Sequence, residues 1–155
     1  MTPNKKAFLD AIAYSELGPE ILAQSDNGYD VIVGSTPGHI IRFSSYDDHP
    51  HRDIRINEHL TSTAAGRYQI LGRIFDHYRE TLGLSDFSPA SQDAIALQLI
   101  RECRALDLIE DGNFADAITA CSSRWASLPG SQYGQHTNKL SLLQQAYVDA
   151  GGMLA

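Results

Sequence analysis

The most constraining feature of this sequence is an N-terminal helical pattern whose apolar face runs directly into a carboxylate. Residues 4–15 carry apolar side chains at helical spacing. Steps of four along this face lead from Phe8 to Ile12 to Glu16. Gly18–Pro19 follows and predicts the end of the helix. Any fold of this chain must therefore place an acid on or beside a helix face meant for the core.

An acid in that position is a candidate for catalysis. A carboxylate that loses hydration favours its neutral form, so the pKa of Glu16 is expected to rise. A carboxylic acid that stays protonated near neutral pH is what a glycosidic general acid requires. The alternative is a helix-end Glu that swings into water, and position alone favours it, because Glu is almost never buried without a reason.

Length and charge narrow the classes of function. A chain of 155 residues fits one compact domain, which we predict to span residues 1–155. The net charge of −7 argues against binding to nucleic acid, whose affinity comes largely from Lys and Arg on phosphates. It also argues against electrostatic capture by anionic lipid. The net charge does not exclude a neutral substrate or one that a local group of residues recognises.

The sequence carries no pattern of membrane insertion or secretion. No stretch is long and apolar enough to span a bilayer. Two lysines near the N-terminus are followed by no apolar region of the kind found in secretory signals. We therefore expect synthesis and retention in the cytoplasm unless another protein provides release. The two cysteines, Cys103 and Cys121, do not suggest a disulfide framework.

The order of local patterns predicts an α+β fold, with a small antiparallel sheet at one side of a mostly helical body. After the first helix, short β-branched runs at 29–34, 40–43 and 53–57 predict the strands of that sheet. Helical spacing then returns in four segments. These begin near Thr63, at Ser88–Pro89, at Asn113 and near Leu140.

Two further groups of residues suit a saccharide site. Residues 62–69 predict the start of a helix, where Tyr68 could offer a sugar platform and Gln69 amide hydrogen bonds. The alternative, a helix start with Tyr68 in the core, is favoured by these residues alone. Tyr133, in a Gly-rich loop, and His49, in the loop after the sheet, could form opposed lips over a groove. A plain surface loop around Tyr133 is equally compatible with the pattern.

Residues next to Glu16 and at the start of the first predicted strand complete the candidate substrate-binding set. Tyr14 lies two positions before Glu16, and Asp30 begins the strand. For Asp30, structural hydrogen bonding is as plausible as ligand contact. His49 and His51 have a spacing seen in metal sites, but no third ligand follows in a recognisable pattern. We therefore predict no metal and no cofactor.

Several long strings of this sequence closely resemble the lambda-type phage endolysins. They occur in the family's order over nearly the whole chain, from about Lys6 to Gly152. The strings are KAFLDAIAYSE (6–16), GYDVIVG (28–34), STAAGRYQIL (62–71), DFSPASQDAIALQ (86–98) and WASLPG (125–130). Residues 66–69 also resemble the Gly-x-x-Gln segment of the wider lytic transglycosylases, where the Gln helps to line the cleft.

The resemblance implies a lysozyme-like fold with a cleft between the helical body and the sheet, bordered by two mobile loops. It implies a lytic transglycosylase that cleaves the bond between N-acetylmuramic acid and N-acetylglucosamine and leaves a 1,6-anhydromuramic end. The family's catalytic glutamate falls on Glu16, at the matching Ser-Glu. The partner is then the glycan strand of the host wall, reached after a separate holin permeabilises the membrane. We expect a monomer that acts in host cell lysis.

Two other functions stay open from the residues. A hydrolytic muramidase would need a second carboxylate, for which Asp26 and Asp30 are the candidates. A single acid suffices if the substrate supplies its own nucleophile, because an intramolecular attack has a high effective concentration. A more remote alternative is a peptidoglycan-binding module without catalysis.

Overall fold

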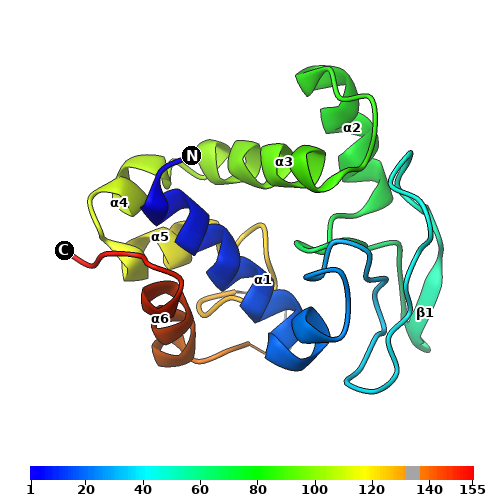
Figure 1. Ribbon diagram of the computed structural model, residues 1–155, viewed down its shortest axis with the longest axis horizontal. Helices are drawn as coiled ribbons and strands as arrows, with labels where there is room; N and C mark the ends of the chain where they lie inside the picture. Colours follow the sequence, from blue (N-terminus) through cyan, green and yellow to red (C-terminus); the bar gives the residue numbers. More distant parts are fainter. Residues whose placement is uncertain (132–136) are drawn as a thin grey trace. The chain divides into compact units, whose positions relative to one another are not determined.

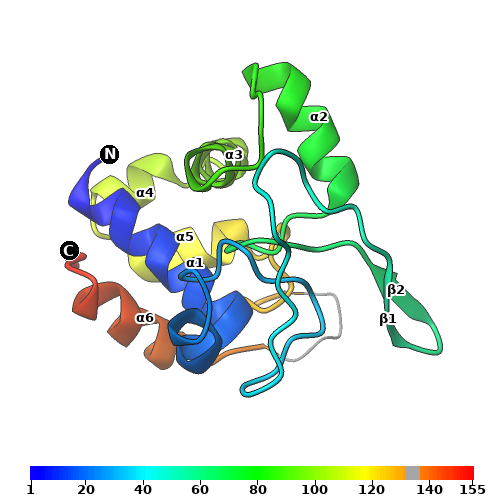
Figure 2. The same cartoon turned by 45° about the vertical axis from the view of Figure 1, so that its right-hand side comes forward.

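The computed structural model of this chain describes residues 1–131 and 137–155. Within them it has mostly helices and one small sheet (Figures 1 and 2). The helices are α1 (Pro3–Ala23), α2 (Gly72–Leu82), α3 (Pro89–Glu102), α4 (Leu106–Glu110), α5 (Phe114–Cys121) and α6 (Leu140–Asp149), and the strands are β1 (Ile54–Asn57) and β2 (Leu60–Ser62). None of the described helices has the length and apolar content needed to cross a membrane.

The chain forms two compact units. The terminal unit comprises Met1–Glu16 and Ala96–Ala155, and the central unit comprises Leu17–Ile95. Their boundaries fall inside α1 and α3. The mostly helical α+β class with a small antiparallel sheet is confirmed. That residues 1–155 act as one catalytic domain stays a prediction.

Helix α1 is interrupted where the sequence predicts its end, but the chain does not leave the helix there for good. Gly18 has φ 78° and ψ 162°, outside the helical region, and the helix resumes at Pro19 and continues to Ala23. Proline suits the first turn of the resumed helix, because the N–H that it lacks would have no partner there. The break falls two residues after Glu16, so the acid lies at the end of the first straight segment.

The terminal unit contains the first part of α1 together with α4, α5 and α6 (Figure 1). The apolar residues of this part of α1 are buried. Phe8 packs edge-on against Phe114 of α5, and Phe114 lies against Tyr147 of α6, with ring centroids 5.8 and 4.7 Å apart. Asn4 ties this helix to the end of α4, where its amide donates to a carbonyl oxygen at 3.0 Å, and accepts the N–H of Met153 at 2.9 Å. These contacts anchor the N-terminal part of α1 within the terminal unit.

The central unit has a smaller sheet than the sequence predicts. The run at 53–57 forms β1, but its antiparallel partner is β2, which was not predicted (Figure 2). The runs at 29–34 and 40–43 form only isolated bridges, from Val31 to Arg42 and from Ile32 to Ala65. Their strands are cut short because the turn-forming residues 34–39 and the neighbouring loop bend the backbone away after a single pairing.

The predicted helix from Thr63 is wrong over its first nine residues. Residues 63–71 form turns and bridges, and α2 begins only at Gly72. Gly66 and Gln69 have φ of 82° and 51°, a left-handed conformation that no α-helix contains. The predicted start at Ser88–Pro89 is confirmed, because the Ser88 hydroxyl accepts the Ser91 N–H at the start of α3. Gly83 ends α2 with φ 65° and ψ 38°.

Candidate active site

Glu16 of the terminal unit has the environment that the helical spacing predicts for it. Its side chain keeps part of its surface accessible, while the surrounding protein removes most of the water around the carboxyl group. Burial raises the pKa of Glu16 from its ordinary value of 4.5 to about 7, and a hydrogen bond from Ser127 lowers it by less. Such a group is partly protonated at neutral pH and can both give and take a proton.

Three residues of the terminal unit to which the sequence analysis assigned no role form a hydrogen-bonded group that reaches this acid through Ser127. The Ser127 hydroxyl donates to Oε1 of Glu16 at 3.2 Å and lies 2.8 Å from the Ser15 hydroxyl oxygen. The Asn138 amide nitrogen donates to the Ser15 carbonyl oxygen at 2.9 Å and to its hydroxyl oxygen at 3.2 Å. Ser15 and Ser127 lie in two of the strings that resemble the endolysin family, 6–16 and 125–130. These strings could have drawn attention to the two serines, but nothing in them marks a role for either residue.

The raised pKa of Glu16 predicts how stability depends on pH. Between about pH 4.5 and about pH 7 the folded protein keeps a proton on Glu16 that the unfolded chain has released. The folded state binds more protons in this window, so this site lowers the free energy of unfolding as the pH rises through it. Glu16→Gln removes the dependence and should gain on the order of 2 kcal/mol relative to the parent between about pH 5 and about pH 8.

Urea unfolding of the parent and of Glu16→Gln at about pH 5 and about pH 8 measures this difference in the free energy of unfolding. A constant difference between the two proteins across the window would mean that the folded state does not raise the pKa of Glu16.

Asp30, a predicted substrate-binding residue, is held inside the central unit by local bonds. It is 6% exposed and forms an ion pair with Arg42, with 2.5 Å between Oδ2 and Nε. Its Oδ1 accepts the backbone N–H of Asp26 at 3.0 Å, and Asp26 in turn accepts the Tyr46 hydroxyl at 2.5 Å. These residues line an open hollow of about 640 Å³ together with Phe43 and neighbouring serines. A ligand role for Asp30 stays a prediction, and its observed role is to fix this loop.

The expectation that Tyr68 offers its ring to a sugar is contradicted by its burial. Tyr68 is 1% exposed, and its hydroxyl donates to Asp93 at 2.6 Å. Its ring packs edge-on to Tyr29, and the Arg67 guanidinium lies over both rings. The core position that the residues alone favoured is therefore the observed one. Burial, followed by the Asp93 charge, raises the pKa of Tyr68 strongly, which keeps its hydroxyl a donor.

Gln69 uses its amide within its own turn. Its Nε2 donates to the Gly66 carbonyl oxygen at 2.8 Å and lies 3.5 Å from the Val31 carbonyl oxygen. The side chain is half-buried, so its contact with a substrate stays a prediction. Tyr14 is partly exposed on α1 and likewise keeps its predicted role as a hypothesis. Tyr133 lies outside the described residues.

His49 is an interior residue and not the lip of a groove, which corrects the prediction. It is 3% exposed, and its ring stacks on Phe75 with centroids 5.8 Å apart. Its Nε2 lies 2.8 Å from the Ile70 carbonyl oxygen, and its Nδ1 accepts the N–H of His51 at 2.9 Å. Nε2 therefore carries the proton of a neutral ring. Burial lowers the pKa of His49 and preserves that form.

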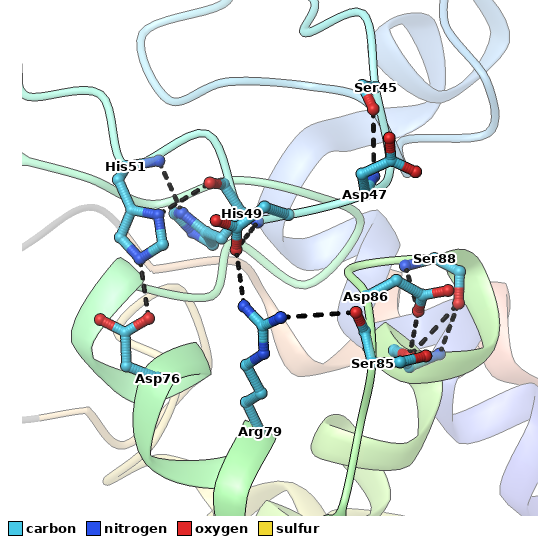
Figure 3. A network of polar contacts seen from close by, with 11 residues as sticks. Ser45, Asp47, His49, His51, Asp76, Arg79, Ser85, Asp86 and Ser88 are labelled. Carbon is cyan, nitrogen blue, oxygen red and sulfur yellow. Dashed lines mark hydrogen bonds and ion pairs between the residues drawn. The ribbon is translucent and has the colours of Figure 1, made fainter.

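His51 completes the polar network drawn in Figure 3. Its Nδ1 lies 2.7 Å from the His49 carbonyl oxygen and its Nε2 lies 2.8 Å from Asp76 of α2. Burial alone would lower the pKa of His51, but the bonds to Asp76 and to the His49 carbonyl raise it above its ordinary value. Both ring nitrogens thus face acceptors. The two histidines are joined to each other and to α2, which accounts for their spacing without a metal ion.

Comparisons with known proteins find relatives over nearly the whole chain. The family model for endolysins matches residues 6–154. The endolysin of Escherichia phage lambda is 50% identical over 150 residues, covering 96% of this chain and 91% of the relative. The endolysin of Escherichia phage P2 is 45% identical over 157 aligned positions, covering 98% of this chain and 95% of the relative.

Two solved structures are similar over 100% of this chain and 98% of their own. Bacteriophage lambda lysozyme complexed with a chitohexasaccharide matches with a TM-score of 0.92 and 47% identity. A second structure of lysozyme from bacteriophage lambda matches with a TM-score of 0.87 and 46% identity. The chain therefore belongs to the endolysin family, and its fold is that of the phage lambda lysozymes.

Proposed function

We propose that this protein is a phage or prophage endolysin that acts as a peptidoglycan lytic transglycosylase, with Glu16 as its catalytic residue. The observation that carries the proposal is the half-buried carboxyl of Glu16, whose pKa burial raises to about 7, at the end of the first segment of α1. Its proposed substrate is the β-1,4 bond between N-acetylmuramic acid and N-acetylglucosamine. A family member that holds a chitohexasaccharide supports a glycan as the ligand.

The proposed reaction needs one acid and no water. Protonated Glu16 gives its proton to the glycosidic oxygen, and the bond between that oxygen and C1 of the muramic residue breaks. The resulting carboxylate then takes the proton of the muramic C6 hydroxyl while the C6 oxygen bonds to C1. Glu16 ends protonated, ready for another turnover, and the sugar ends in a 1,6-anhydro ring. A pKa near 7 suits both halves of this cycle.

The local bonds of the two candidate second carboxylates favour this route over hydrolysis. A retaining hydrolase needs a free carboxylate as nucleophile, and an inverting one needs it as a base for water. Asp30 is occupied by Arg42 and a backbone N–H, and Asp26 accepts the Tyr46 hydroxyl. The substrate's own C6 hydroxyl is the simpler nucleophile, since it is already tethered to C1.

The products of a peptidoglycan digest test the reaction directly. We expect mass spectrometry to show muropeptides with anhydromuramic ends, each lighter by one water than its hydrolytic counterpart, and no new ends reducible by borohydride. The same wall preparation digested by a hydrolytic muramidase is the control. Reducing muramic ends would instead establish the hydrolase with Glu16 and Asp26 or Asp30. An unchanged wall with bound protein would establish a binding module.

We also propose that the enzyme works as a monomer and reaches the wall from the host cytoplasm after a separate holin permeabilises the membrane. The sequence expectation and the family membership support this order of events. Lysis of intact host cells should therefore require either a holin or chemical permeabilisation, whereas purified wall should be cleaved without either.

A further inference from the structure

We propose that Asn138, Ser15 and Ser127 form a one-way chain of hydrogen bonds that keeps Oε1 of Glu16 an acceptor and leaves Oε2 to carry the catalytic proton. The three residues are positioning residues, since they act on the substrate only through Glu16. This inference rests on the proposed function of Glu16 and deepens it, and it is argued from contacts within the terminal unit alone.

The direction of the chain is set at Asn138. Its side-chain amide has one end that only donates and one that only accepts. The group opposite that amide, at 2.9 Å, is the backbone carbonyl oxygen of Ser15, which can only accept. The NH₂ end must therefore face Ser15, and this assignment does not depend on how the amide is drawn. The same nitrogen lies 3.2 Å from the Ser15 hydroxyl oxygen, so it can donate its second proton there.

The two serines pass this direction on to Glu16. A hydroxyl has a single proton to donate. The Ser15 oxygen receives a hydrogen bond from Asn138. The ionised carboxylate of Glu16 can only accept, so Ser127 gives it its proton, and the proton between the two serine oxygens, 2.8 Å apart, is that of Ser15. Ser127 then accepts from Ser15 and has its own proton left for Oε1 of Glu16 at 3.2 Å. Each link uses a donor that the preceding link has oriented, and the chain ends on the carboxyl group.

A serine without this orientation could take the catalytic proton out of position. When Glu16 is protonated, a freely rotating Ser127 hydroxyl could accept a hydrogen bond from the acid. The proton would then lie on Oε1, directed at the protein. An oriented Ser127 donates to Oε1 and occupies that oxygen in both protonation states. The proton of the neutral acid is left on Oε2, the oxygen without a bond from the described residues.

The backbone holds the chain in place from both sides. Asn138 donates its own N–H to the Ser127 carbonyl oxygen at 2.9 Å, so one residue fixes the turn that carries Ser127 and the helix end that carries Ser15. Ser15 is 7% exposed and adjacent to Glu16 on α1. Leu128, which follows Ser127, is fully buried and anchors the turn. The hydroxyl positions are therefore set by packing and not by the hydrogen bonds alone.

Direct titration of Glu16 tests the chain independently of the reaction type. The ¹³C signal of the Glu16 carboxyl, assigned by its loss in Glu16→Gln, is followed against pH in the full-length protein. Ser127→Ala removes the donor to the carboxylate and should raise the Glu16 pKa by about half to one unit. Ser127→Thr keeps a hydroxyl and should restore the parent value. Ser15→Ala and Asn138→Ala, which leave Ser127 in place, should give smaller shifts in the same direction.

Kinetics on soluble glycan fragments supply the second readout. Ser15→Ala and Ser127→Ala should lower kcat about five- to tenfold and change KM less than about twofold, because the chain orients a proton and does not bind sugar. The basic limb of the pH profile should move upward in Ser127→Ala, in step with the titration. Ser122→Ala is the matched control, since that hydroxyl donates to the Thr119 carbonyl oxygen at the end of α5.

The possible failures can be told apart. If the Glu16 pKa is unchanged in folded Ser127→Ala and Ser15→Ala, the proposed chain of hydrogen bonds is refuted, whatever the products of the wild-type digest are. If Ser127→Thr does not restore the parent pKa, the hydroxyl is not the acting group, and the inference is equally overturned. Hydrolytic products together with the expected titration shifts would overturn the transglycosylase and leave the chain intact. A free energy of unfolding of Ser15→Ala close to that of the parent would show that its lower kcat does not come from loss of the fold.

Discussion

Glu16→Gln should lower the initial rate of peptidoglycan cleavage by about a thousandfold. Gln has nearly the same shape as Glu and can still accept the Ser127 hydroxyl, so the helix end and its contacts persist. An amide neither delivers a proton to the leaving oxygen nor takes one from the C6 hydroxyl, so both halves of the proposed cycle stop. The measurement is the release of soluble muropeptides from purified wall, with pelleting of protein on the same wall to follow binding.

Glu20→Gln is the matched control for this experiment. Glu20 lies four residues further along α1, is exposed, and loses the same charge through the same change of atoms. Its rate should stay within about twofold of the parent, because a solvated surface acid has no part in the proposed reaction. If Glu16→Gln cleaves wall at a rate near that of Glu20→Gln, the catalytic assignment of Glu16 is wrong.

Gln92→Leu should lower the free energy of unfolding by about 4 kcal/mol, the largest stability effect that we expect from a single side chain here. Gln92 is fully buried in the central unit. Its Nε2 donates to the carbonyl oxygens of Tyr29 at 3.0 Å and Phe87 at 2.9 Å, and its Oε1 accepts the Arg67 N–H at 3.0 Å. Leu keeps similar volume but leaves three backbone groups without their partner, at Arg67 and Phe87 in buried bonds and at Tyr29 in a part-buried one.

The backbone around Gln92 cannot easily rearrange to absorb that loss. A Cβ on Gly66 would lie 2.3 Å from the Gln92 side-chain oxygen, so the turn packs directly on this amide. Gln98→Leu is the control on the same helix, since its amide donates to exposed Glu102 and its loss should cost less than about 0.5 kcal/mol. Urea unfolding of both variants measures the difference. Equal midpoints would show that the Gln92 bonds contribute no net stability.

Local signals predicted most of the helices, although not α4 as a separate helix, and predicted the sheet poorly. Proline at the start of α3 and glycine after α2 act within a single turn, so the chain itself displays them. Pairing of β-strands depends on which distant segment is available. Val31 and Ile32 have strand-like composition, yet they meet partners at single positions only. The segment 63–71 has helical periodicity, but the left-handed turn at Gly66 and its packing on Gln92 override it.

In the candidate site, too, local spacing predicted one residue correctly, whereas residue type alone did not predict the position of others. Glu16 was found because four-residue steps along one helix place it on the buried face, and burial of a carboxyl raises its pKa by a local mechanism. Tyr68 and His49 were assigned to a ligand by residue type, and both proved to be interior residues. Residue type states what a side chain can bind and not which way it faces.

The sequence by itself determined that a solitary acid ends the first helical face, in a chain with the strings of one lytic family. Only the tertiary structure decided that Ser127 and Asn138, more than one hundred residues away along the chain, would provide its hydrogen bonds. The physical reason is the separation along the chain over which each interaction acts. Helical spacing and caps act over a few residues, whereas hydrogen bonds between distant loops exist only once the core has fixed where those loops lie.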